Sequence, residues 1–387
     1  MIKMFNEIKN LFNRGKGGAS LGFATVLGSL ITGLFGILVA PILGVENYGI
    51  VSYFLAIAGV TFAIVSFGAS HILLVYLAKG IKIFSTISFI TLLSSLIAFV
   101  SIFIIFREIS IGIAVFGFII FELSNSELLA KQLYTKYIKY LLTQKLIFVV
   151  LSISLYFVWG PTGFVLGFAL SMFPGLIRIY YGFKESKIEI CLIKERLDFV
   201  LNSYFLRISR TAYVNVDRLI VFPLFGFMIL GNYELGLQIV LLANVFSVFI
   251  HQYVIPKDSR NESTQKLKFL AIIFSIFVSL SVIFLAPLIM PAIFPQFEES
   301  VDLVPILGLS IVPHMMIMLH MSKFLGAEKN RPILYGSILH LGFFVVAILV
   351  LGNLYSIIGV CIALVLAEIV EAIFLMSLHK KIFKSYL

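Results

Sequence analysis

Long apolar stretches, each bounded by charged or turn residues, recur along the whole chain. A helix that crosses the hydrocarbon core of a bilayer needs about 20 apolar residues, and these stretches are long enough. A membrane β-barrel would instead show short segments of alternating polarity, which these stretches do not. The pattern predicts twelve membrane-spanning helices, near residues 19–42, 49–75, 84–106, 109–130, 140–159, 162–182, 205–228, 232–255, 267–290, 302–322, 333–352 and 355–378.

Composition supports this prediction. Of the 387 residues, 60% are hydrophobic and 12% are charged, whereas soluble domains are roughly 45–50% apolar and about 25% charged. A soluble chain could not bury so much apolar surface and still cover its outside with polar groups. Soluble enzymes and disordered chains are therefore excluded, and we expect an all-α integral membrane protein.

The basic residues indicate how the chain is oriented. If the twelve spans are real, 25 of the 29 Lys and Arg residues lie on the termini and on loops that share one side of the membrane, and only Arg107 lies on the other side. Cytoplasmic loops are enriched in Lys and Arg. We therefore expect a multi-pass protein of the cell membrane with both termini in the cytoplasm. The net charge of +10 is then a result of topology, and no nucleic-acid partner is expected.

The two halves of the chain resemble each other. Leu43–Gly49 reads LGVENYG and joins spans one and two, and Leu230–Gly236 reads LGNYELG and joins spans seven and eight. Parallel repeats of this kind are common in transporters. We expect two six-helix bundles, residues 1–185 and 205–387, around a central cavity, with a cytoplasmic linker at 186–204.

Four short motifs carry a family resemblance. They are Pro41–Gly44 with Tyr48-Gly49, Asn215–Ile220 with Gly231–Tyr233, Ile293–Pro295 with Phe297, and Leu325–Ala327 with Lys329, Asn330 and Arg331. With them the chain resembles the polysaccharide transporters, or Wzx-type O-antigen flippases, of the multidrug/oligosaccharidyl-lipid/polysaccharide exporter superfamily. Many members have fourteen helices, whereas twelve are expected here. The related lipid II flippases carry arginines in their first helix, and this chain has none there, which argues against that branch.

The resemblance implies a flippase. Such a protein moves a polyprenyl-diphosphate-linked oligosaccharide from the inner to the outer leaflet by alternating access, for cell-surface polysaccharide biosynthesis. It implies the lipid-linked oligosaccharide as substrate and contact with membrane lipids. A polysaccharide polymerase and other glycan-assembly proteins are the candidate protein partners.

Span seven carries the candidate substrate site. Arg207, Arg210, Asp217 and Arg218 share an arc of about 120° when the span is drawn as a helix, and Arg218 is about 15 Å deeper than Arg207. Charges at such depth are costly and usually face a cavity. We expect a cationic cavity wall that binds the diphosphate, because guanidinium groups pair well with phosphate oxygens. A second interpretation stays open, in which the arginines are interfacial and Asp217 neutralises one of them structurally.

Embedded acids are candidates for ion coupling. Glu122 lies in span four, and Glu368 and Glu371 share a face of span twelve. Glu127 precedes Lys131 by four residues, which predicts an ion pair instead. His314 and His320 are interpreted as packing or hydrogen-bonding residues.

Cofactor chemistry has no support in the sequence. There is no Walker A pattern, so we expect no ATP hydrolysis. Cys191 and Cys361 lack neighbours at metal-ligand spacing and are interpreted as packing residues, so we expect no cofactor and no metal.

Two rival functions stay open. One is a cation-coupled multidrug or metabolite antiporter of the same superfamily, which would depend on an embedded acid more than on the arginines. The other is a membrane enzyme of glycan assembly. Such enzymes carry large basic outer loops, and the longest outer loop expected here, near 291–301, is short and acidic. We therefore expect a transporter and no enzymatic activity.

Overall fold

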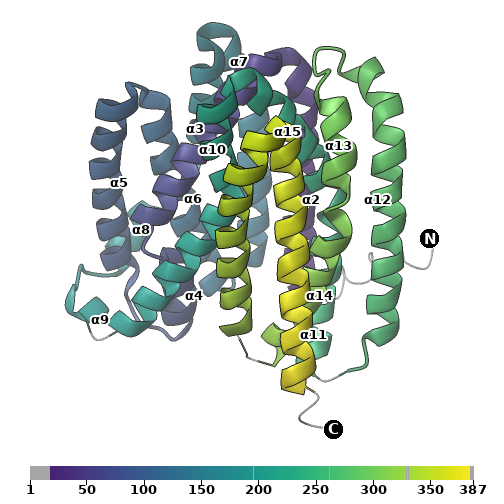
Figure 1. The fold of residues 1–387 in the computed structure, drawn as a ribbon. Coiled ribbons are helices and arrows are strands. Elements are labelled where there is room, and N and C mark those ends of the chain that lie inside the picture. The colour runs from purple at the N-terminus through teal and green to yellow at the C-terminus, as the bar shows by residue number, and fades with distance from the viewer. Residues whose placement is uncertain (1–17, 195, 261, 328, 330, 384–387) are drawn as a thin grey trace. The chain divides into compact units, whose positions relative to one another are not determined.

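The computed structural model describes residues 18–194, 196–260, 262–327, 329 and 331–383. Over these residues the chain is helical and forms no strand. Its α-helices, labelled in Figure 1, are α2 (Gly18–Leu43), α3 (Val45–Val65), α4 (Ala69–Ala78), α5 (Phe84–Phe106), α6 (Ile109–Ala130), α7 (Tyr134–Leu170), α8 (Leu176–Glu185), α9 (Cys191–Lys194), α10 (Leu197–Ala243), α11 (Val245–Ser259), α12 (Gln265–Ile293), α13 (Ser300–Gly308), α14 (Ile311–Gly326) and α15 (Arg331–Phe383). A 3₁₀ turn, η1 (Phe173–Gly175), precedes α8.

The number of membrane crossings agrees with the sequence prediction. In the described part of the chain, nine stretches are long and apolar enough to cross a membrane. Three of these hold 46 to 52 residues, which is enough for two crossings each. Backbone breaks divide their helices α7, α10 and α15, at Trp159–Gly160, Gly226 and Tyr355–Ser356. The total is therefore twelve, and the predicted all-α membrane fold with twelve spanning helices is confirmed.

Several predicted spans consist of two shorter helices. Span two is α3 followed by α4, span eight is the end of α10 followed by α11, and span ten is α13 followed by α14. Proline helps to place the last of these breaks, because Pro313 occupies the first turn of α14, where its missing N–H costs no helical hydrogen bond. The predicted linker at 186–204 is partly helical, since α10 already begins at Leu197.

The same turn occurs in α7 and in α15. Trp159 has φ −128° and ψ 16°, and Gly160 has φ 60° and ψ −143°. In α15, Tyr355 has φ −127° and ψ 15°, and Ser356 has φ 54° and ψ −141°. The positive φ suits glycine and is strained for serine. Both turns join the last two spans of a half, so their near identity supports the internal repeat.

A glycine three residues after each of these turns makes the reversal possible. A Cβ on Gly163 would lie 2.0 Å from the carbonyl oxygen of Leu155, and one on Gly359 would lie 1.9 Å from that of Leu351. No side chain fits at such distances. The two arms of α7, and the two arms of α15, can therefore approach until their backbones touch.

The Asn-Tyr pair shared by the two hairpin motifs also has one local structure. Asn47 and Asn232 each donate their side-chain amide to the carbonyl oxygen four residues earlier, at 3.0 and 3.2 Å. The tyrosines that follow, Tyr48 and Tyr233, are both buried. The sequence similarity at these sites therefore reflects a common conformation.

The contacts divide the chain into two units. The first contains residues up to Ile31 together with Phe54–Thr211, and the second contains Thr32–Tyr53 together with Ala212–Leu387. Thr32–Tyr53 thus belongs with the C-terminal helices, which the predicted division at 186–204 does not anticipate. In the first unit α6 packs against α4, α5 and α7. In the second, α14 packs against α11, α12 and α15.

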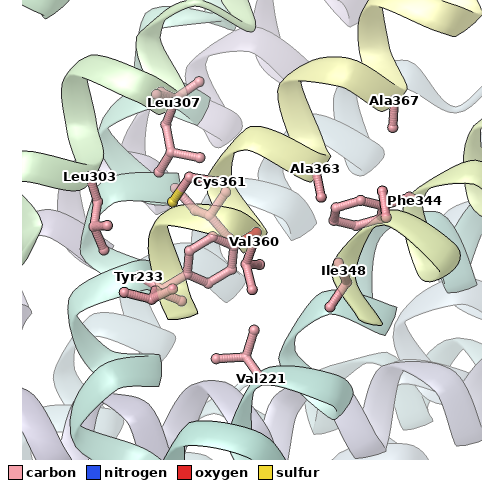
Figure 2. Packing of buried hydrophobic residues seen from close by; sticks show 14 of the residues in the cluster. Val221, Tyr233, Leu303, Leu307, Phe344, Ile348, Val360, Cys361, Ala363 and Ala367 are labelled. Carbon is pink, nitrogen blue, oxygen red and sulfur yellow. The ribbon is translucent and has the colours of Figure 1, made fainter. Parts of the chain in front are cut away.

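The core of the second unit is apolar and closely packed. Tyr233 of α10, Leu303 and Leu307 of α13 and both arms of α15 meet there (Figure 2). Cys361 lies in this cluster, as expected of a packing residue. The same interpretation of Cys191 was wrong, because Cys191 is exposed on the short helix α9.

Candidate functional site

Glu122 of α6 and Arg207 of α10 form a partly buried ion pair in the first unit. The Oε2 atom of Glu122 accepts a hydrogen bond from Arg207. Its Oε1 atom accepts one from the backbone N–H of Ser70, at 3.1 Å. Ser70 lies in the first turn of α4, where the helix dipole also favours a negative charge. Two helices other than its own, α4 and α10, therefore donate hydrogen bonds to the carboxyl group of Glu122.

A glycine allows the two helices to meet at this carboxylate. Gly68 precedes α4 and has φ +68°, a left-handed conformation that favours glycine. A Cβ there would lie 2.7 Å from the backbone carbonyl carbon of Ser203, one turn before Arg207. Because α4 and α10 approach closely here, Arg207 and the first turn of α4 both reach the carboxyl group of Glu122.

Arg207 keeps part of its binding capacity. Its guanidinium lies over the ring of Phe62, 4.7 Å from the centroid, and 28% of the side chain is exposed. Its Nε–H is buried and has no hydrogen-bond partner among the described residues. A buried donor without a partner is costly, so Arg207 is suited to receive a further acceptor.

A second network in the first unit is structural. Glu127 pairs with Lys131 at 2.8 Å, as predicted from their spacing. It also accepts two hydrogen bonds from Arg178, at 2.9 and 2.8 Å, and Lys131 reaches Glu185 at 2.5 Å. Burial lowers the pKa of Lys131, but the hydrogen bonds to Glu127 and Glu185 outweigh it, so this pKa lies above its ordinary value. The network ties α8 to α6.

Arg218 of α10 forms the centre of a buried network in the second unit. Its Nε donates to Glu234 Oε2 at 2.7 Å and its Nη2 to Glu234 Oε1 at 3.2 Å, a two-pronged pair. Its Nη1 donates to Asp217 Oδ1 at 3.2 Å and to the carbonyl oxygen of Val214 at 2.5 Å. All three nitrogens of Arg218 therefore have acceptors.

The two carboxylates of this network have further donors. Tyr233 donates its hydroxyl to Asp217 Oδ2 at 3.0 Å. Ser52 of α3 and Gln238 of α10 each donate to Glu234 at 2.8 Å. Asp217, Arg218 and Glu234 are 3%, 8% and 5% exposed. One guanidinium thus faces two carboxylates inside the protein.

The residues predicted to form one cationic face are held by different partners. Arg207 belongs to the first unit and pairs with Glu122, while Asp217 and Arg218 belong to the second unit. The side chain of Arg210 lies outside the described part of the structure. Glu234 was missed in the sequence interpretation. An acid in span eight, sixteen residues after Arg218, was the available signal for it.

The predicted coupling acids of span twelve both face histidines. Glu368 Oε1 lies 3.3 Å from Nδ1 of His314, and Glu371 Oε2 lies 3.1 Å from Nδ1 of His340. The polar interpretation of His314 agrees with this contact. Among the described residues there is no group of three or more His, Cys, Asp or Glu side chains that could hold a metal ion.

Comparison with solved structures shows that the fold of this chain is a known one. The chain is similar to the lipid II flippase MurJ in an inward closed conformation, with a TM-score of 0.78 and 14% identity over 94% of this chain and 88% of that one. It is also similar to an inward-facing multidrug resistance transporter of the MATE family in the MOP superfamily, with a TM-score of 0.70 and 16% identity over 92% and 95% of the two chains. A third is the MATE multidrug transporter DinF-BH, with a TM-score of 0.67 and 16% identity over 94% of each.

The chain has the fold of the MOP superfamily transporters. Comparison of the sequence with models of protein families and with curated proteins gives no match. The solved structures it resembles are transporters and flippases, not enzymes.

Proposed function

We propose that this protein is a flippase that moves a polyprenyl-diphosphate-linked oligosaccharide from the inner to the outer leaflet by alternating access. The observation that carries the proposal is the Arg207–Glu122 pair, in which a membrane-embedded guanidinium remains partly exposed and has an unused donor. A guanidinium fork fits phosphate oxygens. The motif resemblance to polysaccharide transporters and the fold shared with a lipid II flippase support the same function.

In this proposal the diphosphate competes with Glu122 for Arg207. The substrate brings at least one negative charge to a site that is neutral when the pair is closed. Arg207 can then turn its Nη atoms from Glu122 to the phosphate, and Glu122 keeps the backbone donor of Ser70. Arg218 has no such freedom, because carboxylates and a carbonyl already occupy its nitrogens.

One observation favours a second candidate, a cation-coupled multidrug or metabolite antiporter. In the second unit two carboxylates, Asp217 and Glu234, share the single guanidinium of Arg218. An exporter of cationic compounds needs an embedded negative charge of this kind. The two candidates therefore differ in which cluster binds cargo: Arg207–Glu122 for the flippase, or Asp217–Glu234 for the antiporter.

A translocation assay tests the proposed function. The protein is reconstituted in liposomes with a polyprenyl-diphosphate-linked oligosaccharide, and appearance of the sugar on the opposite leaflet is followed with a membrane-impermeant glycosidase. We expect exposure well above that of protein-free liposomes. Exposure equal to that of protein-free liposomes, together with export of a cationic dye by the same preparation, would contradict the flippase and support the antiporter.

We also propose cytoplasmic termini, which lie outside the described residues, on the strength of the asymmetric Lys and Arg distribution. The test uses a variant without Cys191 and Cys361, with a single cysteine introduced at Glu46 or at Lys329. An impermeant thiol reagent applied to intact cells should label the cysteine at 46 and not the one at 329, and lysis should expose both. Labelling restricted to position 329 would show that the protein has the opposite orientation in the membrane.

A further inference from the structure

Two histidine–glutamate pairs lie in the second unit, where α14 meets both arms of α15. His314 of α14 faces Glu368, and His340 of the first arm of α15 faces Glu371 of the second arm, at 3.3 and 3.1 Å. The histidine side chains are 17% and 2% exposed, and those of Glu368 and Glu371 are 8% and 4% exposed. Three helical segments therefore meet through four titratable groups.

The two pairs differ in geometry. His314 Nδ1 and Glu368 Oε1 are placed to form a hydrogen bond, so they share a hydrogen. His340 Nδ1 and Glu371 Oε2 lie at ion-pair distance, 3.1 Å, without hydrogen-bond geometry between them. A neutral His donating to an ionised Glu leaves the pair with one negative charge. One more proton on the imidazole makes the pair neutral overall. Each pair can thus bind one additional proton. That proton removes the net negative charge of the buried pair.

We propose that His314, Glu368, His340 and Glu371 form a two-proton binding site. Glu368 and Glu371 lie one helical turn apart, so without the added protons their negative charges would repel each other within the membrane. Binding two protons removes this repulsion and joins α14 and both arms of α15 by ion pairs. The proton-binding atoms are the Nδ1 atoms of the two histidines and the carboxylate oxygens that face them, at 3.3 and 3.1 Å.

The elements packed against the site carry further titratable or charged groups. They are Asp302 on α13, His251, Lys257 and Asp258 on α11, His320 and Lys323 on α14, Lys268 on α12, and His379 and Lys380 on α15. On α10, Asp217, Arg218 and Glu234 pair with one another.

A second histidine pair extends the site along the same two helices. The Nδ1 atoms of His320 and His379 are 3.2 Å apart. His320 is about 9 Å along α14 from His314, and His379 is about 12 Å along α15 from Glu371. Beyond them lie Lys323 and Lys380, on the predicted cytoplasmic side. Chains of His and acidic side chains conduct protons in membrane transporters, and this second pair lies between the site and the predicted cytoplasmic ends of both helices.

Proton uptake by the purified protein in lipid nanodiscs tests the site directly. The medium is acidified from about pH 8 to about pH 5, where histidine titrates, and bound protons are counted with a pH-indicator dye. The variant Glu368→Gln/Glu371→Gln should bind about two protons fewer per chain than the wild type, and each single variant about one fewer.

Glu298→Gln is the matched control, because it removes an exposed carboxylate between α12 and α13 and leaves the pairs intact. Wild-type proton uptake by Glu368→Gln/Glu371→Gln would overturn the proposal. Wild-type uptake by both single variants, Glu368→Gln and Glu371→Gln, in folded form would also overturn it. The experiment contains no substrate, so its result does not depend on the flippase function.

Discussion

Replacing Arg218 with methionine should remove most of the folded protein from the membrane. Asp217 and Glu234 would then be buried without their shared cation. Breaking a buried ion pair from one side costs about 3–5 kcal/mol, a large fraction of the roughly 5–15 kcal/mol that stabilises a typical protein. Folded yield and thermal stability, measured by size-exclusion chromatography in detergent, should both fall.

A compensating variant separates this structural role from substrate binding. Arg218→Met/Glu234→Gln removes one charge of each sign, so the network keeps the net charge of the wild type. Much of the lost stability should return, because effects within one network are not additive. Arg260→Met is the matched control, since Arg260 is 76% exposed and its pair with Glu262 is long, at 3.8 Å. Wild-type stability of Arg218→Met itself would show that the network does not hold the fold.

The sequence was sufficient to predict the twelve spans because each span is specified by residues that are close together in the sequence. A run of apolar residues specifies a crossing, and a turn residue specifies its end. Gly160 and Gly226, at the breaks within α7 and α10, both have positive φ, and both lie at the edge of a predicted span. The pair Glu127–Lys131 is local in the same sense, since its members are four residues apart on one helix.

The partners of the site residues could not be predicted in the same way. A helical projection shows that Arg207, Asp217 and Arg218 share a face, but it does not show which other helix that face meets. Glu122 is 85 residues from Arg207 in sequence, and only the packing of α4, α6 and α10 brings them together. Once the helices are packed, Arg207 and Arg218 each pair with the acids that lie nearest to them.

The division of span seven between the two units has the same origin. Arg207 and Arg218 are eleven residues apart on one helix, yet the contacts assign them to different units. Ser52, which reaches Glu234, shows why, because Thr32–Tyr53 packs with the second unit although it is early in sequence. Such an exchange of segments is a property of tertiary packing, and no local pattern encodes it.

Replacing Arg207 with alanine should abolish translocation of the lipid-linked oligosaccharide while folded protein still reaches the membrane. Arg207 is more exposed than Arg218, so its loss removes fewer packing contacts. The acid left behind, Glu122, can take up a proton instead of remaining charged. Arg207→Lys should restore only part of the activity, because an ammonium group is a point charge and cannot hold two phosphate oxygens as a fork does.

The variant Arg207→Ala/Glu122→Gln decides between substrate binding and a purely structural pair. It removes both charges, so a structural pair predicts recovery of transport, whereas diphosphate binding predicts that transport stays lost. Glu122→Gln alone should keep substrate binding, since Arg207 is then released from its acid. Arg210→Ala belongs in the same series as a test of the predicted cationic face, and Arg260→Ala is its surface control. Translocation is scored per folded protein in liposomes. Full activity in Arg207→Ala/Glu122→Gln would show that Arg207 does not bind the diphosphate, and would favour cargo binding at the acid cluster around Arg218.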